Sequence, residues 1–263
     1  MGKPSKPFVI DCHAQLGEGE TWAEPKRAVD YKVEMVLERA AEAGIDRSCV
    51  SAPQNRSYEQ ANVLVARLCE KYPDKLIGFA VHNPQAEAGR LKARLAEEAR
   101  TMGLKGVKTD GHPTREVLDA AAELGMPVIY YPKDSWPLAN PSWELIRWYH
   151  LMTDAYPTVN FILPHLGRYR SAPAASGWWI HIEAIDLAKR HPNIHLEASG
   201  IDSHLYREMA AKELPSEQIV FGSYAPELDP RVEIYALKLL KLPPEQEAKA
   251  LGGNMQRLLH MSD

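Results

Sequence analysis

The stretch Phe8-Val9-Ile10-Asp11-Cys12-His13-Ala14-Gln15 predicts a first β-strand that ends in polar side chains. Its apolar beginning favours extended backbone in a buried sheet. Side chains two positions apart on a strand point to the same side, so His13 and Gln15 are expected to share one face. Two histidines at this spacing could hold one metal ion, whereas Gln15 offers a weaker, neutral amide. The stretch therefore indicates a strand end suited to binding or catalysis, with a glutamine where a second histidine would complete a metal-binding pair.

The bulk composition is that of one globular domain. The 263 residues are 45% hydrophobic and 25% charged, which is typical of a folded protein rather than a disordered one. A single α/β barrel needs about 250 residues, so we expect one domain over residues 1–263. The net charge of -4 argues against nucleic acid or an anionic membrane as the main partner.

Apolar runs and cysteines indicate the compartment. No apolar run reaches the roughly 20 residues of a membrane span, and residues 1–7 lack the apolar core of a signal peptide. The three cysteines, Cys12, Cys49 and Cys69, are an odd number in a long chain without a secretion signal, which favours reduced thiols. We therefore expect a cytoplasmic protein.

Short apolar runs alternate with helical patterns along the chain. Eight runs predict strands, at residues 8–13, 48–52, 76–82, 106–109, 128–131, 159–164, 193–197 and 219–222. Helical patterns cover residues 31–43, 58–71, 86–102, 114–124, 143–155, 179–189 and 204–214, and closing helices, broken at Gly252-Gly253, follow residue 243. The expected fold is α/β, a (β/α)8 TIM barrel. A doubly wound sheet is the alternative, weakened because no glycine-rich dinucleotide fingerprint follows the first strand.

In such barrels the reactive side chains stand at the carboxyl ends of the strands. Seven candidate site residues lie at those ends: His13, Lys108, Tyr131, His165, Arg168, Glu197 and Tyr224. Asp11 is expected to be structural and to accept hydrogen bonds beneath the first turn. Cys12 is expected to face away from the side that His13 faces, because neighbours on a strand alternate. His82 and His112 are expected to be loop or capping histidines.

Six fragments, each weak alone, form an ordered series along the chain. They are the first-strand motif, Gly106-Val107-Lys108, Met126-Pro127-Val128-Ile129, His165-Leu166-Gly167, Phe221-Gly222-Ser223 and Gly252-Gly253-Asn254-Met255-Gln256-Arg257-Leu258. In this order and spacing the chain resembles the amidohydrolase-related family of single-barrel, metal-dependent hydrolases. The resemblance implies a TIM barrel that acts on small carboxylated or aromatic substrates as a hydrolase or decarboxylase.

The resemblance also implies a metal set, which this chain does not reproduce. By position, His13 matches the first ligand, and His165 matches a histidine beside the metal that takes part in catalysis. Gln15, Tyr131 and Tyr224 stand where the family has two further histidines and an aspartate. A catalytic zinc normally needs about three ligands from His, Cys, Asp and Glu. We therefore expect a degenerate metal site without the family's divalent ion.

Two alternatives concern Glu197. With His195 on the same side of the seventh strand, it could supply ligands to a rebuilt metal site. It could equally be a buried acid paired with Lys108 or an arginine. Without a metal, His165 and His13 are the expected catalytic residues, and a small-molecule ligand would contact Lys108, Tyr131, Tyr224, Arg168, Glu197 and Gln15. The two tyrosines could instead only fill the space of a lost metal and water.

Two functions fit this pattern. The first is an amidohydrolase-like enzyme that uses His165 as acid or base. The second is a non-catalytic barrel that pairs with a metal-competent paralogue. The family commonly forms dimers, so a homo-oligomer or a hetero-oligomer with a related barrel is expected. Tryptophans that could mark an interface lie around the fifth and sixth strands: Trp136, Trp143, Trp148 and Trp178-Trp179.

Overall fold

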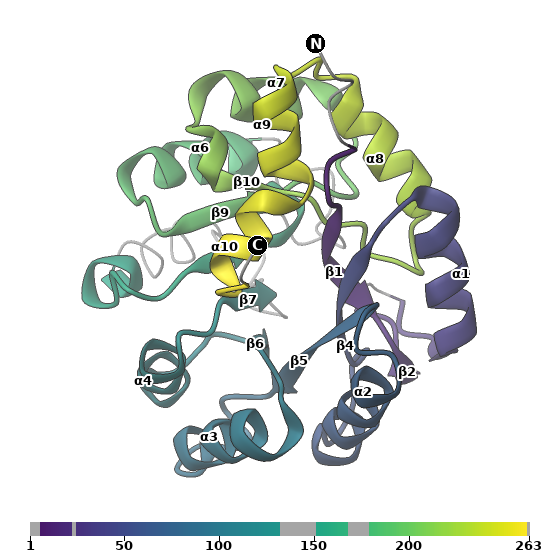
Figure 1. Cartoon of the computed structure of the whole chain (residues 1–263). Helices are drawn as coiled ribbons and strands as arrows, with labels where there is room; N and C mark the ends of the chain where they lie inside the picture. Colours follow the sequence, from purple (N-terminus) through teal and green to yellow (C-terminus); the bar gives the residue numbers. More distant parts are fainter. Residues whose placement is uncertain (1–5, 23–24, 132–150, 168–178, 262–263) are drawn as a thin grey trace.

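The computed structural model describes residues 6–22, 25–131, 151–167 and 179–261. At its centre is a parallel eight-stranded sheet in the order β1-β4-β5-β6-β7-β8-β9-β10, with helices around it (Figure 1). The strands are β1 Ile10–Gln15, β4 Arg47–Ser51, β5 Leu76–His82, β6 Gly106–Asp110, β7 Val128–Tyr131, β8 Phe161–Leu163, β9 Ile194–Glu197 and β10 Ile219–Val220. All eight predicted strands are present, and the TIM-barrel expectation is confirmed.

The barrel closes between β1 and the segment that follows β10. Tyr224 N donates to His13 O at 2.7 Å, and Gln15 N donates to Ala225 O at 2.7 Å. These bonds continue the parallel pairing past the end of β10. They place the polar end of β1 beside the polar residues that follow β10.

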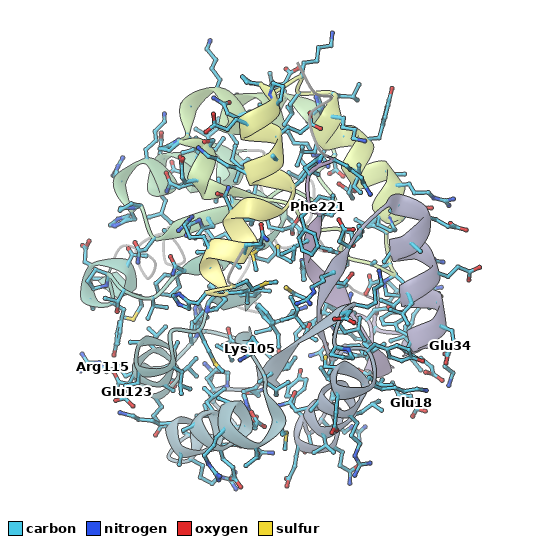
Figure 2. The ribbon with its side chains drawn as sticks, viewed as in Figure 1. Glu18, Glu34, Lys105, Arg115, Glu123 and Phe221 are labelled. Carbon is cyan, nitrogen blue, oxygen red and sulfur yellow. The ribbon has the colours of Figure 1, made fainter. Side chains whose placement is uncertain are left out.

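Helices cover the outside of the barrel in chain order. They are α1 Val33–Ala43, α2 Glu59–Lys71, α3 Leu91–Met102, α4 Arg115–Leu124, α6 Trp179–Arg190, α7 His204–Glu213 and α8 Pro230–Lys238. Each turns an apolar face toward the strands and a charged face to solvent. In Figure 2, Glu34 on α1 and Arg115 and Glu123 on α4 lie at the outer rim, whereas buried Phe221 lies further in, beside the C-terminal helices. None of the described helices combines the length and apolar character needed to cross a membrane.

An antiparallel hairpin follows β1, where the sequence predicted no strands. It pairs β2, Gly17–Glu20, with β3, Ala28–Tyr31. The first helix therefore begins at Val33 rather than at residue 31. The hairpin segment carries Trp22 and Tyr31, both buried, to the carboxyl end of the barrel.

The barrel interior has an apolar layer toward the amino-terminal ends of its strands. It contains Ile10, Cys12, Cys49, Ile77, Phe79, Ile129, Ile162 and Val220, closed by Met255 and Leu258. Cys12 thus faces inward, so the expectation that it faces away is wrong. The pairing of β1 with β4 is irregular between Asp11 and Ala14, which lets Cys12 and His13 both reach the interior.

The C-terminal segment closes the amino-terminal end of the barrel and lies across the front of the view in Figure 1 (yellow). It runs without a break through α9, Pro244–Ala248, a π-helical turn, Lys249–Gly253, and α10, Asn254–Leu258. The predicted break at Gly252-Gly253 is therefore wrong. A Cβ atom on Gly252 would lie 2.0 Å from the Phe8 carbonyl oxygen, so glycine is needed there for close packing rather than for a helix end.

Candidate active site at the carboxyl end of the barrel

Five predicted residues meet at the carboxyl end of the barrel. His13 belongs to β1, Lys108 to β6 and Glu197 to β9, while His165 follows β8 and Tyr224 follows β10. Their side chains are at most 2% exposed. Two imidazoles, an amine, a carboxylate and a phenol from distant parts of the chain thus lie together in one part of the barrel that excludes solvent. Such a low-dielectric setting strengthens every charge interaction within it.

Glu197 is the acceptor at the centre of this group. Its Oε2 accepts from His13 Nδ1 at 3.2 Å, from Ser199 Oγ at 3.1 Å and from the His165 backbone N at 3.3 Å. Its Oε1 accepts from the Ser199 backbone N. Glu197 is therefore a buried acid, as one alternative expected, but its hydrogen bonds run to the two histidine segments and Ser199.

His13 lies between Glu197 and Lys108. Its Nε2 is 3.2 Å from Lys108 Nζ, and an ammonium can only donate, so Nε2 accepts and Nδ1 carries the proton given to Glu197. Burial and the adjacent Lys108 charge hold the pKa of His13 well below its usual value. Burial also lowers the pKa of Lys108 to about 7, against the attraction of nearby carboxylates. The Trp22 ring lies 4.6 Å from Lys108 Nζ and covers the amine.

His165 is fixed by the loop after β9. Its Nδ1 is 2.8 Å from Ser199 O, and a carbonyl only accepts, so Nδ1 carries the proton. The His165 backbone has φ 55, a left-handed conformation that costs free energy for a non-glycine residue. Strain of this kind persists where the surroundings determine the conformation. In this conformation the His165 imidazole lies beside the rings of His13 and Tyr224.

Tyr224 packs its ring against both imidazoles. The ring centroids lie 5.0 Å from His13 and 4.8 Å from His165, the latter in an edge-to-face arrangement. Tyr224 also has a positive φ, 56. Asp11 supports the same corner, because its Oδ1 accepts from the backbone N of His13 at 3.0 Å and of Ser223 at 2.9 Å. Burial raises the pKa of Asp11 to about 6 despite these bonds, and its expected structural role is confirmed.

A second polar group borders the first. Gln15 Nε2 lies 3.4 Å from Glu227 Oε1, and Tyr31 OH donates to the same oxygen at 3.1 Å. The carboxylate fixes the Gln15 amide with its nitrogen toward Glu227. Gln15 Oε1 is then buried without a hydrogen-bond partner in the described structure. The sequence reasoning missed Glu227 and Tyr31; the one available signal was that Glu227 is the first carboxylate after the eighth strand.

The other predicted residues lie apart from this site or have side chains outside the described residues. His195 bonds to Asn160 Oδ1 and Glu217 O, both at 3.1 Å, which are near the amino ends of strands. Because two residues on a strand span about 6.6 Å, His195 lies one layer below Glu197 and does not join it as a metal ligand. Tyr131 pairs with Asp110 through the strand backbone, but its side chain is outside the description. Arg168 and Trp136, Trp143, Trp148 and Trp178 lie outside the described residues.

His13, His165 and Glu197 also form a candidate metal-ligand cluster. One ligand atom from each lies within 4.8 Å of the others. Two imidazoles and a carboxylate are a suitable donor set for zinc or manganese. Both nitrogens of His13 are engaged, however, because Nε2 accepts from Lys108 and Nδ1, which faces Glu197, donates to that carboxylate. The residue types suit a metal, whereas the His13 nitrogen on the side of Glu197 carries a proton instead of a free lone pair.

The chain matches one protein family and several solved structures of the same fold. Residues 10–261 match the family described as amidohydrolase. A search of curated proteins gave no match. The structure of 5-carboxyvanillate decarboxylase from Sphingomonas paucimobilis superposes with a TM-score of 0.73 at 14% identity, covering 98% of this chain and 100% of that one.

Two further structures are similar to the same extent. The 2,6-dihydroxybenzoate decarboxylase from Rhizobium gives a TM-score of 0.75 at 16% identity, with 97% of this chain and 99% of that one covered. A dihydroxybenzoic acid decarboxylase from Polaromonas, with bound manganese and 2-nitroresorcinol, gives 0.74 at 16% identity over 97% and 98%. Identities this low establish the fold alone.

Proposed function

The chain belongs to the amidohydrolase family, and on this premise we propose that it decarboxylates a small aromatic carboxylic acid at the carboxyl end of its barrel. The decarboxylases of similar fold act on acids of this kind. The observation that carries the proposal is the buried group of Lys108, His13 and His165, which brings an amine and two imidazoles within reach of one ligand.

Lys108 is the proposed anchor for the carboxylate. An ammonium in a dry site binds a carboxylate by a charge-assisted hydrogen bond, and His13 beside it holds the amine in place. The Trp22 ring over the amine offers an apolar face to an aromatic ligand. Gln15 and Tyr224 complete the proposed lining from β1 and the segment after β10.

His165 is the proposed acid that completes the reaction. Loss of carbon dioxide breaks the bond between the ring and the carboxyl carbon, and the electron pair left on the ring carbon takes up one proton. Ser199 O fixes the tautomer of the His165 ring by accepting from Nδ1. Nε2 is therefore the atom that takes up a proton from solvent to give an imidazolium, and then delivers this proton to the ring carbon of the substrate.

Decarboxylation is favoured over hydrolysis because hydrolysis needs a base for the attacking water. Both oxygens of Glu197 already accept hydrogen bonds. Tyr224 lies at the place where the family's aspartate is expected and offers a phenol instead of a carboxylate. No step of the proposed reaction uses a metal ion, because both His13 nitrogens are engaged, Nε2 by Lys108 and Nδ1 by Glu197.

The test is a substrate screen with the purified full chain. Hydroxylated benzoic acids, including 2,6-dihydroxybenzoate and 5-carboxyvanillate, are incubated with the protein, and carbon dioxide release is followed with the loss of acid by chromatography. Release that disappears in Lys108→Met and persists in Lys105→Met, a change of an exposed lysine just before β6, supports the proposal. A chain that binds these acids without turnover would instead be a non-catalytic barrel.

A further inference from the structure

We propose that Arg207 is a positioning residue for His165, which acts by holding the turn at residues 198–201 whose Ser199 carbonyl accepts from the His165 ring. The consequence for turnover rests on the proposed function, in which His165 delivers a proton. The position of the ring does not depend on that function and is measured without a substrate.

Arg207 places its guanidinium group on the outside of this turn. The side chain comes from α7 and is buried. Its Nε donates to Ala198 O at 3.0 Å and its Nη1 to Ile201 O at 3.3 Å, while Nη2 donates to Glu233 Oε2 on α8 at 2.9 Å. A guanidinium is planar and its N–H groups point in fixed directions, so it holds its acceptors in one relative arrangement. Two of these three bonds go to the turn, which a residue that only joined α7 to α8 would not need.

The two carbonyls held by Arg207 lie on either side of the residue that fixes His165. Ser199 O accepts from His165 Nδ1 at 2.8 Å, and Ser199 Oγ lies 3.2 Å from the same nitrogen. The Ser199 backbone N donates to Glu197. Because the peptide units of the turn are planar, holding the carbonyls of Ala198 and Ile201 restricts the direction of the Ser199 carbonyl between them. The guanidinium thereby acts on the imidazole through one peptide group.

The turn also packs directly against the His165 ring. Gly200 has a left-handed φ of 62, and a Cβ atom there would lie 3.3 Å from His165 Nδ1 and 3.1 Å from Leu228 Cδ1. A small displacement of this backbone therefore reaches the imidazole. Glu197 Oε2 is 3.9 Å from His165 Nδ1, which is too distant for a hydrogen bond that would hold the ring in place of Ser199.

The experiment follows the Nδ1 proton of His165 by NMR in the full chain labelled with nitrogen-15 histidine, and His165→Gln identifies its signal. The tested chain combines Arg207→Met with Glu233→Leu. Removing the arginine alone would leave a buried carboxylate without its partner, whereas apolar replacement of a whole buried pair is often neutral for stability. The matched control is Arg190→Met, a change of an exposed arginine at the end of α6.

We expect the His165 Nδ1 proton to exchange with water about 10-fold faster in the double variant than in wild type and in Arg190→Met, because one hydrogen bond contributes about this factor. His195 is the internal control, since its Nδ1 donates to Glu217 O near the amino ends of the strands. Its proton should exchange equally in all three chains. Equal acceleration of both histidines, or an unchanged His165 signal in the folded double variant, would overturn the proposal.

Two further measurements complete the test. Arg207→Lys replaces the double variant if that chain does not fold, because a single ammonium beside Glu233 lacks the planar fork that reaches both turn carbonyls. If wild type releases carbon dioxide from an aromatic acid, the double variant should lose up to about 100-fold in kcat with KM little changed, since Lys108 still anchors the carboxylate. An unchanged kcat would overturn the consequence for turnover. A wild type without turnover would refute the proposed function alone, and proton exchange would still decide the role of Arg207.

Discussion

Glu197 holds His13 from another wall of the barrel: Oε2 and Nδ1 lie 3.2 Å apart although 184 positions separate the two residues in the chain. The bond sets the tautomer of His13 and thereby the direction in which its Nε2 accepts from Lys108. The same carboxylate accepts from the backbone of His165. One buried acid therefore orients both candidate catalytic histidines.

Removing the charge of Glu197 should destabilise the fold as well as the site. Glu197→Ala leaves the His13 and Ser199 donors unsatisfied inside the barrel, so the free energy of unfolding should fall by about 3 kcal/mol. Urea denaturation followed by circular dichroism measures the change. Glu208→Ala, an exposed glutamate on α7, is the matched control and should leave the midpoint within error. Equal midpoints for both variants would refute the supporting role of Glu197.

His165 should matter for turnover more than for folding. Replacing a positioned acid or base typically costs at least about 100-fold in rate, and His165→Ala should lose this much of any decarboxylation found. His204→Ala changes a half-buried histidine on α7 and is the control. The measurement is the steady-state rate at saturating acid, with folding checked by circular dichroism. An unchanged rate in His165→Ala would remove His165 from the mechanism.

His82 should make the stability depend on pH in a predictable direction. It is buried in β5, where Nδ1 lies 3.0 Å from Glu87 and Nε2 lies 2.8 Å from Glu98. Burial lowers the pKa of His82, but the bonds to the two carboxylates raise it by more, so the net pKa is above the ordinary 6.5. The stabilisation is therefore complete below pH 6.5 and is lost as pH rises through the folded-state pKa.

The comparison that isolates this effect is wild type against His82→Gln. The difference in their free energies of unfolding should be largest near pH 6 and should shrink toward pH 9. The same series with His204→Gln corrects for the general pH dependence of the chain. A difference that stays constant from pH 6 to pH 9 would show that His82 does not gain protons on folding.

Two neighbouring glycines should respond differently to alanine. In Gly252→Ala the new methyl would meet the Phe8 carbonyl at 2.0 Å, and backbone cannot yield easily, so we expect a loss of about 3 kcal/mol and a Tm lower by roughly 6–12 °C. In Gly253→Ala the nearest atom is 3.6 Å away, so the Tm should be unchanged or higher. Calorimetry compares the two, and equal Tm values would contradict the packing of the tail against β1.

Local patterning was sufficient to predict the barrel and the segments that reach its carboxyl end. The strands are short, apolar on both faces and separated by amphipathic helices, and these features act over a few residues. Parallel strands in a barrel share one end, so His13, Lys108, His165, Glu197 and Tyr224 could be expected there together. Their proximity is confirmed, while their catalytic and binding roles remain predictions.

Partners across the barrel could not be predicted in this way. The sequence treats His82 as a loop or capping residue, but it lies in β5 between Glu87 and Glu98, which α3 and the loop before it supply. Glu227 reaches Gln15 only because the segment after β10 folds back beside β1. Cys12 faces inward because of an irregular register that no alternation rule contains.

The sequence by itself thus determined the fold and the identity of the groups at the barrel's end, because strand and helix periodicity are local properties. Only the tertiary structure decided how those groups are bonded: Lys108 to His13, His13 to Glu197, and His165 to Ser199. These bonds join groups from different walls of the barrel at distances near 3 Å. A displacement of that size between two strands would change the bonding partners, and the order of residues along the chain does not determine such a displacement.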